Sequence, residues 1–115
     1  MEDDRLGLQT LLDLDGERFV LESGYWTKFE VRLVEANQNV PHGIKYSLTL
    51  HDRTGERVLG YDNAHAVRPQ GNRYAARRLR WDHRHQGPKV TAYEFSSAGQ
   101  LLEDFWLDVE RVLNA

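Results

Sequence analysis

The sequence contains no cysteine and only three prolines among its 115 residues. The lack of cysteine excludes disulfide bonds, thiolate metal sites and cysteine nucleophiles. No apolar run approaches the roughly 20 residues that cross a bilayer, and residues 1–4 are acidic where a secretory signal would be basic and then apolar. With 40% hydrophobic residues, the chain can bury one core. We therefore expect a single cytoplasmic domain over residues 1–115, with an ordered core over about 10–113.

Lysine is also scarce, since arginine supplies most of the 15 basic residues, and the bases are unevenly placed. The net charge is −3, yet the segment 68–89 holds seven bases against a single acid. Arginine makes bidentate contacts with phosphate, so a segment of this kind is typical of polyanion binding. It would equally suit an acidic protein partner. The acidic remainder of the chain argues against a protein that coats duplex nucleic acid.

Alternating apolar and polar residues predict half-buried strands over 28–33 and 44–51. Asp15 and Gly16 stand between the short apolar runs 11–14 and 19–21, which is a strong signal for a β-hairpin. Further strands are expected over 58–61, from about 77 to 82, and over 89–95, with a long loop over 62–76 and a turn over 84–88.

The C-terminal residues follow a different period. Apolar side chains recur there at helical spacing: Leu101, Leu102, Phe105, Trp106, Val109, Val112 and Leu113. Ser97 followed by Gln100 fits a capping box, which satisfies amide groups at a helix start. These patterns predict a helix over about 98–113. The fold class is therefore α+β, an antiparallel meander sheet of about six or seven strands with one C-terminal helix packed on one face.

Two short clusters at predicted strand ends carry the residues suited to proton transfer. They are Tyr61, Asp62 and His65 in the first cluster, and Asp82, His83 and His85 in the second. Histidine exchanges protons near neutral pH, and a neighbouring carboxylate fixes its tautomer. Basic residues nearby can hold a phosphate and stabilise developing charge; the candidates are Arg78, Arg80, Arg84 and Lys89. RNA cleavage by its own 2′-hydroxyl needs these parts and no cofactor.

A metal site is the competing interpretation of the same residues. His83 and His85 lie on one side of an extended strand, and His65 with Asp62 could complete a ligand set. The surrounding arginines would oppose a bound divalent cation. We find no glycine-rich phosphate loop, nucleophile elbow or helix-turn-helix pair in the sequence.

The spacing of several motifs resembles that of a known protein family. These motifs are Tyr46-Ser47-Leu48-Thr49-Leu50-His51-Asp52, Leu59-Gly60-Tyr61-Asp62-Asn63-Ala64-His65, Asp82-His83-Arg84-His85, Tyr93-Glu94-Phe95 and Leu101-Leu102-Glu103-Asp104-Phe105. Together they resemble the TumE family of small prokaryotic toxins, over about residues 11–113. The resemblance implies a toxin of a toxin–antitoxin system, encoded beside a helix-turn-helix antitoxin that neutralises it and represses the operon. It implies no settled catalytic residues.

The sequence therefore supports two hypotheses about activity. The first is a toxin of a type II system that acts as a metal-independent endoribonuclease, with histidine acid/base chemistry and arginine contacts to phosphate. The alternative is a non-catalytic module that binds RNA or a protein through segment 68–89. In either case an open sheet edge could pair with a second copy or with the antitoxin, and no membrane partner is expected.

Overall fold

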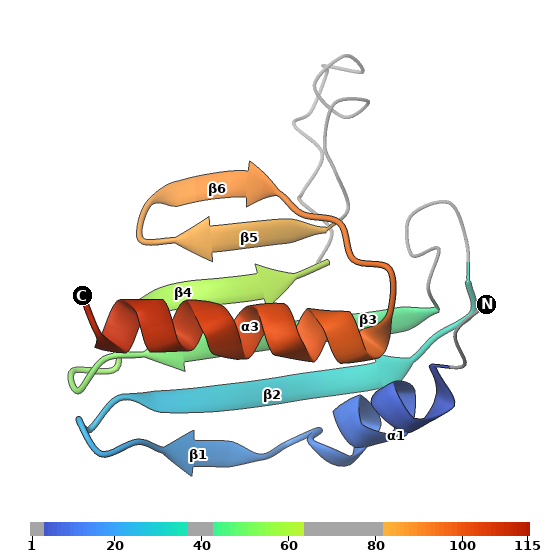
Figure 1. Ribbon diagram of the computed structural model, residues 1–115, viewed down its shortest axis with the longest axis horizontal. Helices are drawn as coiled ribbons and strands as arrows, with labels where there is room; N and C mark the ends of the chain where they lie inside the picture. The colour runs from blue at the N-terminus through green and yellow to red at the C-terminus, as the bar shows by residue number, and fades with distance from the viewer. Residues whose placement is uncertain (1–3, 37–42, 64–81) are drawn as a thin grey trace.

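The computed structural model describes residues 4–36, 43–63 and 82–115 of the chain (Figure 1). The helices and strands in that part are, in chain order, α1 Arg5–Asp13, β1 Arg18–Val20, β2 Trp26–Leu33, β3 Ile44–His51, β4 Arg57–Asp62, β5 His83–Gln86, β6 Lys89–Ala92 and α3 Ala98–Leu113.

The strands in the described ranges form one six-stranded sheet in the order β1-β2-β3-β4-β5-β6. Every neighbouring pair is antiparallel, so the chain follows a simple meander. The predicted α+β fold class, with its antiparallel meander and C-terminal helix, is confirmed. Strands β1 and β6 form the two edges of this sheet.

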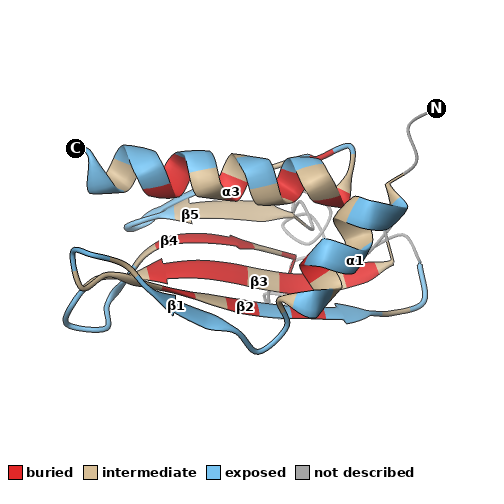
Figure 2. Cartoon of the chain, turned by 60° about the horizontal axis from the view of Figure 1, so that its bottom comes forward, coloured by how far each residue is buried: buried red, intermediate tan, exposed pale blue. Residues whose placement is uncertain are grey.

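The core lies between the sheet and α3. Along β2 and β3 the predicted alternation holds, because Phe29, Val31, Tyr46 and Leu48 are buried while the residues between them are mostly more exposed. In Figure 2 the helices lie over one face of the sheet, where the buried residues of the central strands and of α3 gather. We call this the helix face. The opposite face carries no helix among the described residues, and we call it the open face.

Helix α3 forms because its apolar stripe meets the sheet and its first turn is capped twice. Phe105 packs edge-on against Phe29, with ring centroids 5.5 Å apart. The side chain of Ser97 accepts a hydrogen bond from the Gln100 amide at 3.1 Å, as the capping box predicts. The carboxylate of Asp4, far away in sequence, accepts from the Ala98 amide at 2.6 Å. The N-terminal segment therefore stabilises the start of the C-terminal helix.

The predicted hairpin around Asp15 and Gly16 is wrong in its first arm. Residues 11–13 belong to α1 and residue 14 is its C-cap, with Leu11 fully buried. The helix forms because Leu8, Leu11 and Leu12 share one helical face and pack into the core. The Asp-Gly pair still makes the turn, with Gly16 at φ 82°, but it joins a helix to a strand.

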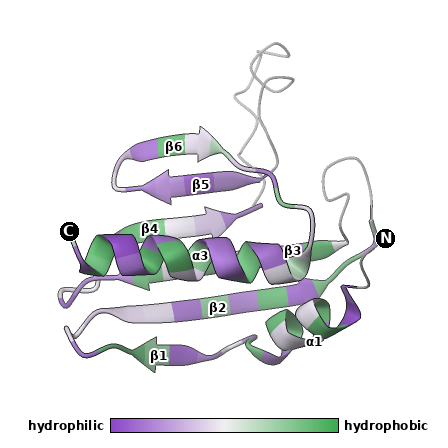
Figure 3. Ribbon diagram, viewed as in Figure 1, coloured by the Kyte–Doolittle hydropathy of each residue, from purple (hydrophilic) through white to green (hydrophobic). Residues whose placement is uncertain are grey.

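The turn predicted over 84–88 is also wrong in part. Arg84, His85 and Gln86 belong to strand β5, and the turn is confined to Gly87 and Pro88. The short run His83–Gln86 has no apolar residue that periodicity could detect, and Figure 3 shows β5 as hydrophilic along its length. The strand expected from about 77 to 82 and most of the loop over 62–76 lie outside the described residues.

Neither helix in the described ranges has the length and apolarity that crossing a membrane would require.

Gly7 allows α1 and α3 to approach closely. A Cβ atom there would lie 2.8 Å from the Gly99 amide nitrogen and 2.5 Å from an Asp4 carboxylate oxygen. We therefore expect Gly7→Ala to lower the free energy of unfolding by about 1–3 kcal/mol, as overpacking does. Denaturant titration followed by circular dichroism measures this change.

Gly99→Ala is the matched control for this prediction. A Cβ atom at Gly99 would meet its nearest neighbour at 3.8 Å, which is an ordinary contact. Alanine also favours the helix over glycine, so stability should stay the same or rise. Equal losses in the two variants would contradict the close approach at Gly7.

Candidate functional site

The pairing of β4 with β5 brings together the two clusters that the sequence singles out. Asp62 stands directly opposite His83 in the register, and Tyr61 stands opposite Arg84. Asn63 fixes the end of β4, because its side chain accepts from the Tyr46 amide at 3.0 Å and donates to the Ile44 carbonyl at 2.6 Å. The register therefore places residues 61–62 beside residues 83–85.

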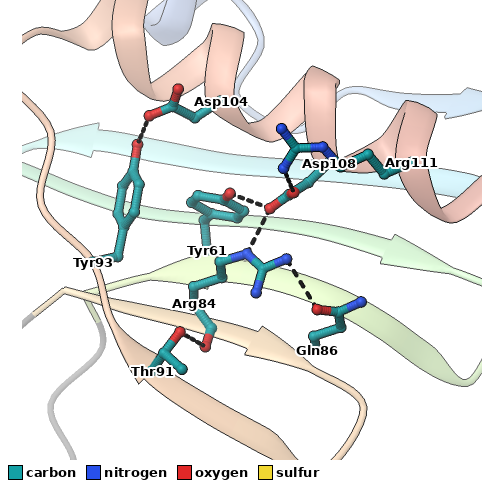
Figure 4. A network of polar contacts seen from close by, with 8 residues as sticks. All are labelled: Tyr61, Arg84, Gln86, Thr91, Tyr93, Asp104, Asp108 and Arg111. Carbon is teal, nitrogen blue, oxygen red and sulfur yellow. Dashed lines mark hydrogen bonds and ion pairs between the residues drawn. The ribbon is translucent and has the colours of Figure 1, made fainter.

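Side chains in a strand alternate between its two faces, so the convergent residues separate into two groups. Tyr61 and Arg84 lie on the helix face, where both contact α3 (Figure 4). Asp62, His83 and His85 lie on the open face. The sequence analysis treated these residues as one candidate site, whereas the sheet places them on two opposite faces.

The helix-face group is centred on Asp108, whose carboxylate is 3% exposed. It accepts a hydrogen bond from the Tyr61 hydroxyl, from Arg84 Nε at 2.6 Å and from Arg111 at 3.1 Å. Burial acts to raise the pKa of Asp108, but the bonds from Arg84 and Tyr61 and the two positive charges outweigh it, so the pKa falls below its ordinary value. Asp108 therefore stays ionised.

A pocket of about 360 Å³ opens beside this group. Its lining residues are Tyr61, Arg84, Asp104, Leu107, Asp108 and Arg111. Burial raises the pKa of Tyr61, and its bond to Asp108 adds to the effect. The hydrogen bond to Asp108 likewise raises the pKa of Arg84. These groups keep their protons near neutral pH, so they suit a structural role better than proton transfer.

The open-face group, by contrast with the helix-face group, contains side chains suited to proton transfer. His85 Nε2 lies 3.1 Å from an Asp62 carboxylate oxygen, and both side chains are largely buried. Because a carboxylate only accepts, Nε2 carries the proton and Nδ1 keeps its lone pair. The ring of His83 lies 6.1 Å from that of His85, measured between centroids. Two imidazoles and a carboxylate thus share one patch of the surface.

The pKa of His85 lies below its ordinary value of about 6.5. Burial is the largest cause, and the charges of Arg57 and His83 add to it, while Asp62 opposes them. His85 is therefore neutral near pH 7, with one nitrogen held by Asp62 and the other able to take a proton. This is the arrangement of a positioned general base.

Arg57 completes the open-face group, and the sequence analysis did not find it. It lies outside the basic segment 68–89, at the exposed start of β4. A Cβ atom on Gly60 would lie 3.4 Å from Arg57 Cδ, so the arginine side chain runs across Gly60. Gly60 is the register partner of His85. The missing side chain at Gly60 thus allows a guanidinium to lie close to the imidazole.

The other predicted site residues have varied positions. Asp82 accepts a hydrogen bond from the Tyr46 hydroxyl at 3.0 Å, and Lys89 is exposed at the start of β6. His65, Arg78 and Arg80 lie outside the described residues. Within the described ranges, no three carboxylate or imidazole side chains are grouped so that they could hold a metal ion; the ligand set that includes His65 is not described.

Asp108 is the second residue that the sequence analysis missed. A detectable signal exists, because Asp108 lies on the apolar stripe of α3, three residues after Phe105 and seven after Leu101. A charged residue at a core-facing position of a helix indicates a buried partner.

Loss of the Asp108 charge should destabilise the fold. We expect Asp108→Asn to lower the free energy of unfolding by about 3 kcal/mol near pH 7, because the partly buried Arg84 loses its counter-charge. The pKa of Asp108 is lower in the folded chain, so its contribution is present above the unfolded pKa of about 4 and is lost as the pH falls through the folded value. Urea titrations of both proteins at pH 7 and pH 3 should show the difference shrinking in acid.

Glu103→Gln removes an exposed carboxylate from the same helix and serves as the control. Its stability should match that of the original chain at both pH values. A difference between Asp108→Asn and the original chain that stays constant with pH would contradict the role of the ionised carboxylate.

The charges around His85 should set its pKa in opposite directions. Asp62→Asn should lower the pKa of His85 further, and Arg57→Ala should raise it. Arg111→Ala removes a guanidinium from the helix face and should leave the titration unchanged. Histidine ring resonances followed by NMR across pH 4–9 measure all three variants, and a His85 titration indifferent to both neighbours would show that the group does not form.

Comparisons with known proteins were made for the whole chain. No curated protein and no solved structure matches it. A family model described as Toxin TumE matches residues 13–113, which is nearly the full length and includes every described residue of both groups. The chain therefore belongs to the TumE family of toxins.

Proposed function

We propose that this toxin is a metal-independent endoribonuclease whose cleavage site is the open-face group. The observation that carries the proposal is the Asp62–His85 pair at 3.1 Å, with the ring of His83 6.1 Å away. The pair supplies a neutral imidazole held in one tautomer, and His83 supplies a second imidazole that could act on the other side of a phosphate.

The proposed reaction is cleavage of RNA by its own 2′-hydroxyl. His85 Nδ1 removes the 2′-hydroxyl proton as the 2′-oxygen bonds to phosphorus. Protonated His83 gives its proton to the departing 5′-oxygen as the P–O5′ bond breaks. The products are a 2′,3′-cyclic phosphate and a 5′-hydroxyl, so every proton is accounted for. The Arg57 guanidinium stabilises the charge that develops on the phosphorane oxygens.

The charge of the open face supports an RNA substrate. The strand residues that alternate onto it include five bases and two acids: Arg18, Lys28, Arg32, Lys45 and Arg57 against Glu30 and Asp62. This face is therefore positive in a chain whose net charge is −3. A positive face attracts phosphates.

Arg84 and Tyr61 take a different role in this proposal from the one expected from sequence. Their bonds to Asp108 place them on the helix face. We propose that they position β5, and through it the two histidines, and that Arg57 replaces Arg84 as the contact to the reacting phosphate.

The partner implied by a toxin family is a cognate antitoxin. We propose that this is a type II system, in which a helix-turn-helix antitoxin neutralises the toxin in the cytoplasm by binding it. Strands β1 and β6 are the two edges of the sheet in the described ranges, and we propose that such a partner or a second copy pairs with one of them.

Cleavage assays with purified variants test the mechanism. Short RNA incubated in EDTA should be cut to products ending in a 2′,3′-cyclic phosphate. His85→Ala and His83→Ala should each lower the rate by about 100-fold or more, as the loss of a general acid or base does. Asp62→Asn should lower it less, because it changes only the orientation and charge of His85. When each variant is expressed without the antitoxin, the two histidine variants should relieve growth arrest more than Asp62→Asn does.

Gln86→Ala changes the same strand without touching the open face and should cleave as the original chain does. Unchanged cleavage in both histidine variants would refute this assignment. Activity lost in EDTA and restored by a divalent cation would favour the metal hypothesis. Arrest with salt-dependent RNA binding and intact RNA would favour the non-catalytic module.

A further inference from the structure

An aromatic stack stands on the open face, away from the proposed cleavage group. The rings of Trp26 and His51 lie 4.0 Å apart with an interplanar angle of 9°. The guanidinium carbon of Arg18 lies 5.1 Å from the centre of the Trp26 ring. All three come from the strands β1, β2 and β3, and Trp26 is only half-buried. Trp26 is therefore held in place by His51 and Arg18 on the open face, outside the hydrophobic core.

His51 is fixed in this stack by contacts at both of its ring nitrogens. Its Nδ1 lies 3.1 Å from the Gly55 carbonyl oxygen, and its Nε2 lies 2.9 Å from the Thr49 hydroxyl. Both ring nitrogens are engaged, so the ring plane is held parallel to the indole. His51 therefore contributes to this site through stacking of its ring on Trp26.

The register connects the stack to the cleavage group. Trp26 pairs with His51, and His51 pairs with Arg57, whose side chain runs across Gly60 towards His85. From β2 to β5 there are three strand spacings of about 4.8 Å, and His85 is in register with Thr49, two residues along β3 from His51, so the two ends lie about 16 Å apart. Arg57 lies between the two ends, so a cationic group stands between the aromatic stack and the imidazoles.

We propose that the Trp26–His51 stack binds an unpaired nucleobase of the RNA, a few nucleotides from the bond that is cut. The site deepens the function proposed above and rests on it for its biological meaning. Bases of single-stranded RNA stack on aromatic side chains, and cations beside them hold the backbone. Arg18 flanks the stack and can take that second role, whereas Lys28 beside it is ion-paired with Glu30 at 2.7 Å.

The contact between Arg18 and Trp26 does not obstruct this site. An exposed cation–π contact is weaker than the stacking of a base on an aromatic ring. An arriving base can therefore take the indole surface while the exposed Arg18 side chain turns to a phosphate. A duplex offers no free base surface, so the site selects single strands.

Binding of a cleavage-resistant RNA tests this site without relying on catalysis. The probe is a fluorescein-labelled single strand of eight 2′-O-methyl nucleotides, followed by fluorescence anisotropy. Trp26→Leu keeps an apolar side chain but removes the aromatic surface, and should weaken binding between about 5-fold and about 150-fold. Trp26→Phe keeps an aromatic ring and should retain most of the affinity.

Phe19→Ala is the matched control, since it removes a partly exposed aromatic ring that packs on Phe29 and Trp106 at the helix face. Its RNA affinity should equal that of the original chain. A duplex of the same sequence should bind the two Trp26 variants equally. Thermal unfolding checks that each variant is folded.

The outcomes separate this site from the proposed nuclease. Weak binding by Trp26→Leu alone supports the stack even if no RNA is ever cut. Equal affinity of Trp26→Leu, Trp26→Phe and the original chain overturns it, and so does a failure of the original chain to bind the single strand. In either of those cases, cleavage that depends on His85 would leave the nuclease mechanism intact.

Discussion

The buried carboxylate of Asp108 determines where strand β5 lies. This strand reads His-Arg-His-Gln and has no apolar side chain to place against the core. Its attachment to the helix side of the molecule depends on Arg84, which donates to Asp108 at 2.6 Å. Tyr61 from the neighbouring strand donates to the same carboxylate, so one acid on α3 holds β4 and β5 together (Figure 4). Buried charges of this kind are worth little if replaced as a pair but cost much if one partner is lost.

The position of the histidines follows from this attachment. Arg84 faces α3, and a strand alternates its side chains, so His83 and His85 on either side of it must face away from the helix. The β4–β5 register then places Asp62 beside them. Slipping that register by one residue would turn the imidazoles towards the core and the guanidinium towards solvent. The β4–β5 register therefore determines both the Asp108 group on the helix face and the proposed cleavage group on the open face.

The sequence predicted the helices and strands that have a clear periodic pattern of their own. It did not predict the features that depend on contacts between distant parts of the chain. Helix α3 and strands β2 and β3 follow from their own periodicity, as observed. Helix α1 was missed because the short apolar run 11–14 beside the Asp15-Gly16 turn also fits a hairpin arm, and the packing of Leu11 into the core decides for the helix. The sequence singled out Asp62 and His85 as site residues, but their proximity and the face on which each lies required the register. Arg57 could not be found, since its approach to His85 depends on the bare backbone at Gly60.

The proposed attraction of a polyanion by this acidic chain depends on opposite charges on the two sides of the sheet. Helix α3 carries four acids and one base, while the open face carries an excess of bases. A phosphate chain on the open face would lie next to these bases, with the sheet between it and the acids of α3. The interaction energy falls with distance, so the nearer bases would act on the phosphates more strongly. The net charge of −3 then limits non-specific attraction at other surfaces without weakening the one face where a phosphate would meet the imidazoles.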